Sequence, residues 1–411
     1  MLPRNFLKNL DWPLAVCALA LTAMGLLFLY SMSWVDDLPR PLIAHFYQQC
    51  IWLGIAGAIA YGVLLLDYKL WTRVAWLVYL ANIILLAVLL FAGTKTHGAG
   101  SWISFGVMKF QPSEVTKVLF IITFAYFLAR YNPELNRVGV LGAALLQFAV
   151  PFALIVLQPD MGTALVYVAI FTGMLFVAGL DGVRILLAGA LSGSAAIIAI
   201  PFVLKGYQIE RLLAFLHPAS DAVGSGWQLH QARVALGSGG IMGKGLFQGT
   251  QAALGFLPAA HTDFIFAAVV EQAGLIGGLL IVALFLLLLY RIMRIARRAE
   301  DMFATYMAAG VFSMLAFQTC INLGMTVGFL PITGIPLPFV SYGGSSLITN
   351  FAAVALVLVA AVLQHDRGHA DQVRDVRDVA ALPFLVLVQL RRPDQGVADY
   401  VLTSTVNAIM A

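Results

Sequence analysis

The chain has 411 residues, of which 61% are hydrophobic and only 11% are charged, and its mean hydropathy is +0.91. Soluble globular domains carry about 25% charged residues, so the composition excludes an ordinary soluble protein and indicates one that crosses a membrane many times. The formal net charge of +4 comes from basic residues that flank apolar runs, and it gives no reason to expect a nucleic-acid partner.

Apolar runs long enough to cross about 30 Å of hydrocarbon as helices recur along the chain. They begin near Pro13, Ala44, Leu70, Ser113, Val138, Asp160, Val183, Asp263, Phe303 and Ser345. The runs are continuous in Leu, Ala, Ile and Val, and they lack the short alternating segments of a membrane β-barrel. The sequence therefore predicts an all-α polytopic membrane protein with about ten transmembrane helices.

Basic residues are distributed unequally between the loops of this arrangement. If the chain starts inside, the short inner segments hold Arg4, Lys8, Lys69, Arg73, Arg130, Arg137, Arg184, Arg291, Arg294, Arg297 and Arg298. The short outer loops hold only Arg40, Lys95 and Lys109. The positive-inside rule therefore predicts that both termini are cytoplasmic and that the large loop before the eighth helix faces outward.

The longest stretch that is not simply hydrophobic runs from residue 205 to residue 266 and delivers His261, Thr262 and Asp263 to the start of the eighth apolar run. An ionisable group at the start of a membrane-spanning segment is costly, and it is a functional candidate by default. The structural alternative is an acid that caps the helix and interacts favourably with its dipole. The residues alone leave both interpretations open.

Two other predicted outer loops also carry charged residues where a helix begins. In QPSEVTK, Glu114 and Lys117 are three residues apart on one face of a first helical turn, so we expect a mutual ion pair. Such a pair is either structural or catalytic, and a pair that lines a polar cavity would satisfy both interpretations. In QPDMGT, Asp160 either caps the next helix or flanks a substrate together with Asp263.

The run GSGGIMGKG in the large loop looks like a phosphate cradle but does not match a P-loop, because Gly245 stands where Ser or Thr is required. We expect its glycines to allow close backbone packing and Lys244 to be available to an anionic headgroup. Arg211 is another cation of the same loop.

The ninth apolar run leads into NLGMTVGFLPITGIPLPFVSYGGSS, which contains Pro331, Pro336 and Pro338. Irregular backbone at membrane depth is tolerated only against protein or a water-filled cavity. We therefore predict a re-entrant wall of a cavity, with Ser341 as a candidate substrate contact. Residues 366–411 are different: a charged stretch is followed by an apolar run too short to span a membrane. We divide the chain into a membrane domain, 1–365, and a cytoplasmic tail, 366–411, with no assigned function.

Several of these motifs occur together and in one order: QPSEVTK, QPDMGT, YQIERLLAFLHP, GSGGIMGKGLFQGTQ, LPAAHTDFIFA and NLGMTVGFLPITGIPLPFVSYGGSS. They resemble the signatures of the SEDS family (shape, elongation, division and sporulation) over residues 11 to about 364. The phrasing is more similar to the elongation members, RodA, than to the division members, FtsW. Two positions depart from the family pattern: Ser101 precedes Trp102 where Arg is usual, and Ala259 follows Pro258 where Glu is usual.

The resemblance implies a peptidoglycan glycosyltransferase that polymerises lipid II at the outer face of the bacterial inner membrane and releases undecaprenyl pyrophosphate. It identifies Asp263 as the catalytic acidic residue, and we hypothesise that this residue is the general base. It implies that a class B penicillin-binding protein and other elongation-complex membrane proteins are partners, and that no nucleotide or nucleic acid is used. Charge develops on the leaving pyrophosphate, so we also expect a cation near it. The candidates are Lys117, Arg211, Lys244 and a divalent cation, Mg²⁺ or Mn²⁺, as cofactor. Candidate substrate contacts are Glu114, Lys117, Asp160, Arg211, Lys244, His261, Thr262 and Ser341.

Two alternative functions stay open on the residues. About ten helices with Gly and Pro breaks and buried acids also suit a flippase or transporter of a lipid-linked precursor, although the polar candidates gather on one side. A non-catalytic scaffold for a penicillin-binding protein is the other alternative. Substituting Asp263 with Asn separates them, because a scaffold should tolerate the change.

Overall fold

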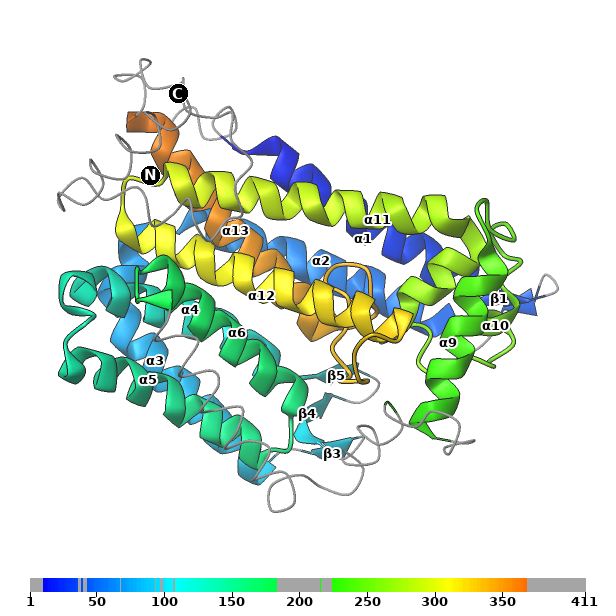
Figure 1. The fold of residues 1–411 in the computed structure, drawn as a ribbon, viewed down its shortest axis with the longest axis horizontal. Helices are drawn as coiled ribbons and strands as arrows, with labels where there is room; N and C mark the ends of the chain where they lie inside the picture. Colours follow the sequence, from blue (N-terminus) through cyan, green and yellow to red (C-terminus); the bar gives the residue numbers. More distant parts are fainter. Residues whose placement is uncertain are drawn as a thin grey trace, which may run out of the picture.

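The computed structural model describes residues 10–35, 38–39, 43–66, 68–92, 94–96, 99–105, 108–182, 215 and 224–367. These residues form a bundle of helices that run roughly along the long axis of the molecule (Figure 1). The helices are α1 Trp12–Ser31, α2 Ile43–Leu65, α3 Tyr68–Ala92, α4 Pro112–Tyr131, α5 Val138–Leu157, α6 Met161–Val177, α9 Ser225–Gly239, α10 Thr250–Ala253, α11 Ile265–Arg298, α12 Met302–Val327 and α13 Gly344–Arg367. A short 3-10 helix, Asn132–Glu134, follows α4.

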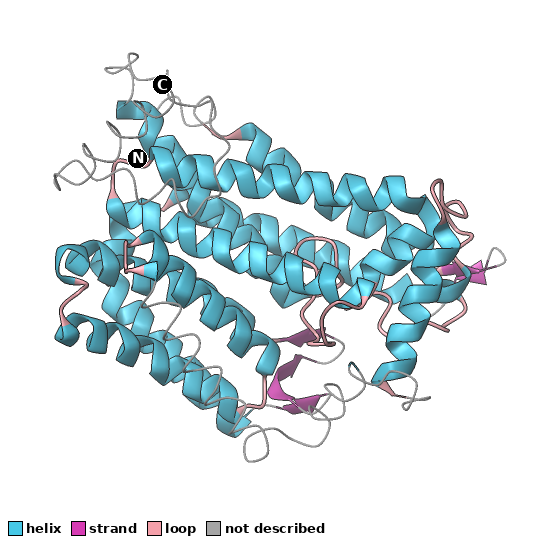
Figure 2. Cartoon of the chain, in the orientation of Figure 1, coloured by secondary structure: helices cyan, strands magenta, loops and turns pink. Residues whose placement is uncertain are grey.

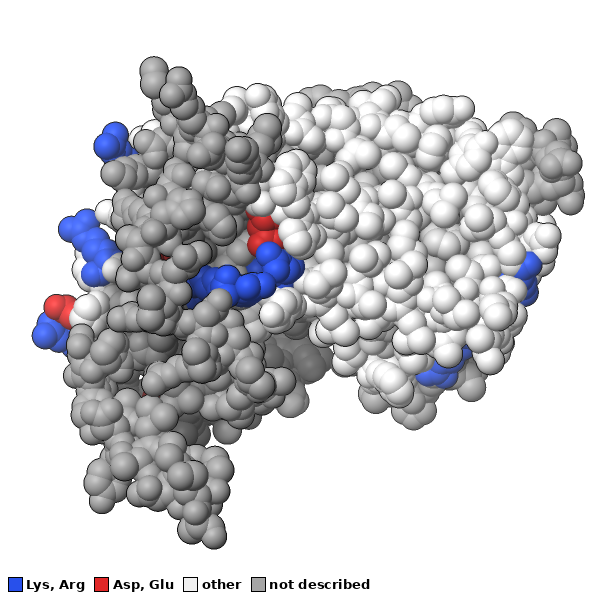
Figure 3. Space-filling model, turned by 90° about the horizontal axis from the view of Figure 1, so that it is seen from above, with Lys and Arg blue, Asp and Glu red and all other residues white. Residues whose placement is uncertain are grey.

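The predicted polytopic helical fold is confirmed. Every predicted run is a helix in the structure except the run near Val183, which lies outside the described residues. Of the described helices, 8 are long and apolar enough to cross a membrane, and α6 is a shorter apolar helix of 17 residues. In Figure 3, the broad white area between the charged group left of centre and the blue patches near the right edge shows no Lys, Arg, Asp or Glu among the described residues, as a hydrocarbon-facing surface requires.

The two ends of the bundle differ. The first residues of α1 and the last residues of α13 lie at the same end, at the left of Figure 1, whereas α9 and α10 lie at the opposite end. The start of α1 and the end of α13 thus lie on the same side, which is what an even number of membrane crossings predicts. Which end faces the cytoplasm stays a prediction from the basic residues.

Short strands are a feature that the all-α prediction did not include. Strands β1 Trp34–Val35 and β2 Leu38–Pro39 form one antiparallel pair, and β3 Thr94–Thr96, β4 Ala99–Phe105 and β5 Met108–Phe110 form a second small sheet. Figure 2 shows that these strands lie in loops between helices. Such loops have to pair their own backbone groups, and local antiparallel pairing is the simplest way to do so. The strands do not change the helical class of the fold.

Burial separates central from peripheral helices. In the spanning part of α13, 94% of the residues are buried inside the protein, and in α4 the share is 72%, whereas it is only 17% in α2 and in α5. Polar side chains on α4, α12 and α13 are therefore surrounded by protein rather than by lipid. The candidate site is built on these central helices.

Helix α11 is broken at Gly274, which has φ 68° and ψ −170°. The break removes helical partners from backbone groups on both sides of it. The Gly-rich segment 240–245 supplies new ones: Lys244 N donates to Glu271 O at 2.9 Å, and Leu275 N donates to Gly240 O at 2.9 Å. The segment thus completes the hydrogen bonding of a broken helix at membrane depth.

The glycines of this segment are needed for that contact. A Cβ atom on Gly243 would lie 2.1 Å from the carbonyl oxygen of Gln272, and a Cβ atom on Gly274 would lie 2.2 Å from the carbonyl oxygen of Ile241. Both glycines also have positive φ angles, which L-residues adopt at a cost. The prediction that this run serves close backbone packing is confirmed.

Candidate active site

Glu114 and Lys117 lie in the first turns of α4, which begins after Gln111 with Pro112 as its first residue. Their side chains form the predicted ion pair, with Lys117 Nζ 2.7 Å from Glu114 Oε1. The pair is buried, since only 1% of the Lys117 side chain and 8% of the Glu114 side chain are exposed. A buried pair in a central helix has to compensate its own charge, which explains the close contact.

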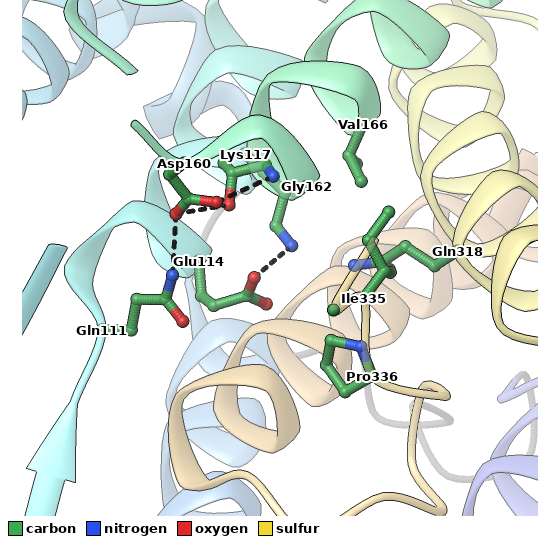
Figure 4. Close-up of a pocket in the computed structure, with 11 residues that line it drawn as sticks. Gln111, Glu114, Lys117, Asp160, Gly162, Val166, Gln318, Ile335 and Pro336 are labelled. Atoms are coloured by element: carbon green, nitrogen blue, oxygen red, sulfur yellow. Dashed lines mark hydrogen bonds and ion pairs between the residues drawn. The ribbon is translucent and has the colours of Figure 1, made fainter. Parts of the chain in front are cut away.

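Asp160 joins the beginnings of α4 and α6. It is the N-cap of α6, and its Oδ1 accepts a hydrogen bond from Thr163 N at 3.1 Å. Its Oδ2 accepts from Gln111 Nε2 at 2.8 Å and from Ser113 Oγ at 3.2 Å. The capping role weighed in the sequence is therefore present, and it also brings Asp160 next to the Glu114–Lys117 pair (Figure 4).

A small polar cavity of about 40 Å³ lies between these helix starts and the loop after α12 (Figure 4). It is lined by Gln111, Glu114, Lys117, Asp160, Gly162, Thr163, Val166, Gln318, Gly334, Ile335 and Pro336. Two lining acceptors, Glu114 Oε2 and Gln318 Oε1, are buried and make no hydrogen bond within the part of the chain that the structure describes. The cavity has room for water, and it presents unsatisfied acceptors to any donor that enters. The predicted cavity wall from the Pro-rich loop is thus present at Gly334, Ile335 and Pro336.

Asp263 lies in the turn that precedes α11. Ala259 starts this turn with φ 53°, a left-handed conformation that is uncommon for a residue with a side chain. Its carbonyl oxygen accepts hydrogen bonds from Thr262 N at 3.1 Å and from Phe264 N at 3.2 Å. The turn is therefore closed by hydrogen bonds to Ala259, the position where the sequence departs from the family pattern. It places Asp263 just before the start of α11.

The carbonyl groups of His261, Thr262 and Asp263 each accept a donor from the C-terminal part of the chain. Tyr342 N donates to His261 O at 2.9 Å, Ser341 Oγ donates to Thr262 O at 2.6 Å, and Asn322 Nδ2 donates to Asp263 O at 2.9 Å. We call these donors, from Asn322, Ser341 and Tyr342, the carbonyl clamp. Through the clamp, the predicted catalytic loop and the predicted re-entrant loop form one unit.

His261 also packs its ring beside the site. The ring centroid lies 4.9 Å from that of His45 on α2, and the Tyr342 ring packs edge-on against His45 at 4.7 Å. Burial and the neighbouring His45 lower the pKa of His261 to about 4. The imidazole is therefore neutral at neutral pH, and it adds no charge next to Asp263.

The predicted cations occupy different places. Lys117 lines the cavity, whereas Lys244 donates to Glu271, with Nζ 2.7 Å from Oε1, and to Thr250 Oγ1 at 2.9 Å. Arg211 lies outside the described residues. Ser341 is only 4% exposed, and its hydroxyl both donates to Thr262 O and accepts from Leu337 N, so its role in substrate contact stays a prediction.

Sequence reasoning missed Gln318 and Asn322. They are four residues apart on α12, so they share one face of the helix, and both are buried. A pair of amide side chains on one face of an apolar run is a signal that could have identified them.

The sequence was compared with models of known protein families. The model of the FtsW, RodA and SpoVE family, described as "Cell cycle protein", matches residues 11–366. The chain belongs to this family. The SEDS resemblance is thereby confirmed. The chain is an integral, multi-pass protein of the bacterial inner membrane.

Curated relatives within the family carry different names. The chain is 36% identical over 365 residues to "Probable peptidoglycan glycosyltransferase FtsW" of Trichlorobacter lovleyi, which covers 86% of this chain and 93% of the relative. It is 39% identical over 282 residues to "Peptidoglycan glycosyltransferase MrdB" of Escherichia coli K12, covering 68% of this chain and 75% of the relative.

Solved structures in the family share the fold. The chain is similar to a structure described as "Structural coordination of polymerization and crosslinking by a peptidoglycan synthase complex", with a TM-score of 0.73, 30% identity, and coverage of 87% of this chain and 98% of the other. It is also similar to the rod shape determining protein RodA of Thermus thermophilus, with a TM-score of 0.65, 28% identity and the same coverage.

Proposed function

We propose that this protein is a peptidoglycan glycosyltransferase that polymerises lipid II into glycan strands at the outer face of the inner membrane during cell elongation. One observation carries the proposal: the carbonyl clamp joins the Asp263 turn to the loop that forms one wall of the cavity lined by Glu114 and Lys117. Relatives named as peptidoglycan glycosyltransferases supply the reaction class.

In the proposed reaction, the Asp263 carboxylate acts as a general base. It takes the proton of the 4-hydroxyl of the acceptor N-acetylglucosamine, and this oxygen attacks the anomeric carbon of the donor N-acetylmuramic acid. The bond from that carbon to the pyrophosphate oxygen breaks, and undecaprenyl pyrophosphate leaves with the electron pair. One displacement converts the α-linked donor into a β-linkage, and the pyrophosphate needs no acid to protonate it.

Negative charge develops on the leaving pyrophosphate, so a cation is expected near it. Among the described candidates, Lys117 lines the cavity, whereas Lys244 is bound to Glu271 and does not line it. We therefore assign this role to Lys117. Glu114 orients the ammonium group through the 2.7 Å ion pair.

A divalent cation was a candidate cofactor. Among the described residues, no group of three or more His, Cys, Asp or Glu side chains could hold a metal ion. Asp160 is occupied by Gln111, Ser113 and Thr163, and a cation at Glu114 would face the Lys117 ammonium. The described donors therefore do not fit a metal, and no step of the mechanism passes through one. Chelation tests the candidate directly.

The proposed partner is a class B penicillin-binding protein that crosslinks the new strands. The similar structure of a peptidoglycan synthase complex, whose description joins polymerization with crosslinking, supports this assignment. The elongation role and the association with other elongation-complex membrane proteins rest on the RodA-like phrasing of the motifs, because the relatives include FtsW and MrdB.

The test is polymerisation of labelled lipid II by the purified protein, alone and with its penicillin-binding partner. Asp263→Asn keeps the shape of the side chain but removes the base, and a well-placed base contributes about 10²–10⁴-fold. We therefore expect glycan synthesis to fall by this factor while the melting temperature stays unchanged. Glu134→Gln is the matched control, because Glu134 is exposed and pairs only with exposed Arg137.

A second arm adds a chelator to the wild-type reaction, and a loss of activity that Mg²⁺ or Mn²⁺ restores would support the cofactor. Glycan strands made equally well by wild type and Asp263→Asn would overturn the assigned base. If neither makes strands with the partner present, yet both bind it equally, the scaffold or flippase alternative replaces the proposal.

A further inference from the structure

Asn322 lies on α12 with 0% of its surface exposed. Its amide nitrogen donates two hydrogen bonds, to Asp263 O at 2.9 Å and to Ile335 O at 2.9 Å. A primary amide has two N–H groups, so this geometry uses the full donor capacity of the side chain. A polar side chain inside a membrane-spanning helix is costly, which makes it a candidate for a functional role.

The two acceptors of Asn322 belong to the two loops on which the proposed reaction depends. Asp263 is the proposed base, and Ile335 lines the cavity that contains the Glu114–Lys117 pair. Within the carbonyl clamp, Ser341 and Tyr342 also join these loops, but both belong to the second loop itself and move with it. Asn322 instead stands on a central helix and contacts both loops from outside.

We propose that Asn322 is a positioning residue that fixes Asp263 relative to the cavity wall. The inference rests on the proposed function, and it deepens that function by naming the group that sets the distance between base and cavity. The planar amide holds its two N–H groups at a fixed angle. A hydroxyl offers only one donor, and a carboxylate offers none.

The other end of the same side chain supports this inference. Asn322 Oδ1 is buried and makes no hydrogen bond within the described structure. An unsatisfied buried acceptor is destabilising and calls for an explanation. The penalty of the unsatisfied oxygen is the cost of holding the amide with both donors directed at the two loops.

The expected effect is on turnover. A displacement of about 1 Å of a catalytic group reduces the rate by about 10²-fold. Asn322→Leu removes both donors at similar volume, Asn322→Ser keeps one, and Asn322→Asp keeps none when ionised and one when protonated. We therefore expect kcat to fall by about 10²-fold in the Leu variant and by less in the Ser variant. The KM for lipid II should stay near the wild-type value.

Two further readouts separate positioning from a general loss of structure. Relative to wild type at each pH, Asn322→Asp should regain activity as the pH falls, because protonation restores one donor, while Asn322→Leu should not. Hydrogen exchange should accelerate in residues 259–266 and 331–343 but not in α12. Thr319→Val is the matched control: Thr319 lies on the same helix, 5% exposed, and its hydroxyl makes no hydrogen bond.

The inference is overturned if kcat is retained in all three variants, or if Thr319→Val loses as much kcat as Asn322→Leu. It is also overturned if the three variants lose activity equally at every pH, because then the number of donors does not matter. Failure of the proposed function looks different, since the wild-type protein itself would then make no glycan strands.

Discussion

Two Lys–Glu ion pairs among the described residues have the same length but different surroundings. Lys117 Nζ lies 2.7 Å from Glu114 Oε1 on α4, and Lys244 Nζ lies 2.7 Å from Glu271 Oε1, where α11 meets the Gly-rich segment. Both glutamates have nearly no exposed surface. The difference lies in what else each carboxylate receives.

Glu271 is saturated. Besides Lys244, its Oε1 accepts hydrogen bonds from Thr250 N at 2.8 Å and from Gln251 N at 2.9 Å, and its Oε2 accepts from Ala252 N at 3.4 Å. These N–H groups lie at the start of α10, where they have no acceptor within the helix. Glu271 therefore caps α10 from outside by accepting their hydrogen bonds. This is the pattern of a carboxylate used to build structure.

Glu114 is not saturated. Its Oε1 accepts from Lys117, but its Oε2 is buried without a hydrogen bond and lines the cavity. An unsatisfied carboxylate oxygen is expensive in a protein interior unless something else enters to satisfy it. The comparison teaches that ion-pair distance does not distinguish a structural pair from a pair prepared for a ligand, whereas the remaining acceptor capacity does.

The largest effect on stability is expected when one charge of a pair is removed. The comparison with the variant that lacks both charges then distinguishes the two pairs. Lys117→Met leaves Glu114 buried without its partner, which should reduce the free energy of unfolding by about 3–5 kcal/mol. The double variant Lys117→Met/Glu114→Gln removes both charges and should recover most of that stability while polymerisation stays lost. The corresponding double variant, Lys244→Met/Glu271→Gln, should be less stable than Lys244→Met alone, because the amide nitrogen of Gln replaces one of the two oxygens that cap α10. Denaturation in mixed micelles measures the free energy of unfolding of each variant, and activity assays in parallel measure its polymerisation.

Recovery in both double variants would show that the two glutamates play the same role, and the distinction drawn between them would then be wrong.

A smaller loss of stability is expected from a substitution in the Gly-rich segment 240–245, which places Lys244 beside Glu271. Gly243→Ala places a Cβ atom 2.1 Å from Gln272 O at a positive φ, so the segment has to move. Overpacking of this kind costs about 1–3 kcal/mol. Gly237→Ala is the control, since nothing lies within 4 Å of its added Cβ in α9. Thermal melting of both variants tests the prediction, and equal melting temperatures would contradict it.

Removing Lys244 alone should have a still smaller effect. Lys244→Met leaves Glu271 with its backbone donors from α10, and the lysine side chain is 27% exposed, so solvent already screens the pair. We expect a loss of about 1 kcal/mol in the free energy of unfolding. Polymerisation by the folded protein should be unchanged, whereas Lys117→Met should abolish it. A loss of turnover in folded Lys244→Met would assign this lysine to the reaction as well.

The last prediction concerns the titration of His261, which affects stability only at acidic pH and does not involve the ion pairs. Because its folded pKa is about 4 and its ordinary value is 6.5, the unfolded chain takes up a proton first as the pH falls. Stability is therefore full above about pH 6.5 and declines as the pH falls from 6.5 to about 4. His261→Gln should flatten this part of the stability curve, and an unchanged curve in this variant would contradict the prediction. Melting temperatures measured across this range provide the check.

Local patterns in the sequence predicted much of this architecture. Continuous apolar runs identify the spanning helices, and the three-residue spacing of Glu114 and Lys117 predicts their ion pair, because both depend on neighbours along one helix. The same holds for Asp160, whose capping bonds join it to Thr163 three residues later. These contacts are encoded within one turn.

The remaining contacts could not be predicted because they join distant parts of the chain. Asn322 and Asp263 are 59 positions apart, and Ser341 and Thr262 are 79 apart. No periodicity in the sequence reports such a pairing. Glu271 gave no local signal either, because its partners are the backbone N–H groups of α10, which any sequence could supply. Short strands such as β1 are formed by loop closure rather than by a strand pattern.

The break at Gly274 also constrains how the protein assembles. If α11 entered the bilayer alone, the carbonyls of Glu271 and Gln272 and the N–H groups of Leu275 and Ile276 would lack partners, and each such group costs several kcal/mol in hydrocarbon. Segment 240–245 precedes α11 in the chain, so it has already been synthesised when α11 leaves the ribosome. We therefore expect the two to insert as one hairpin-like unit, in which the Gly-rich segment pairs the backbone groups of α11 that the break leaves without helical partners.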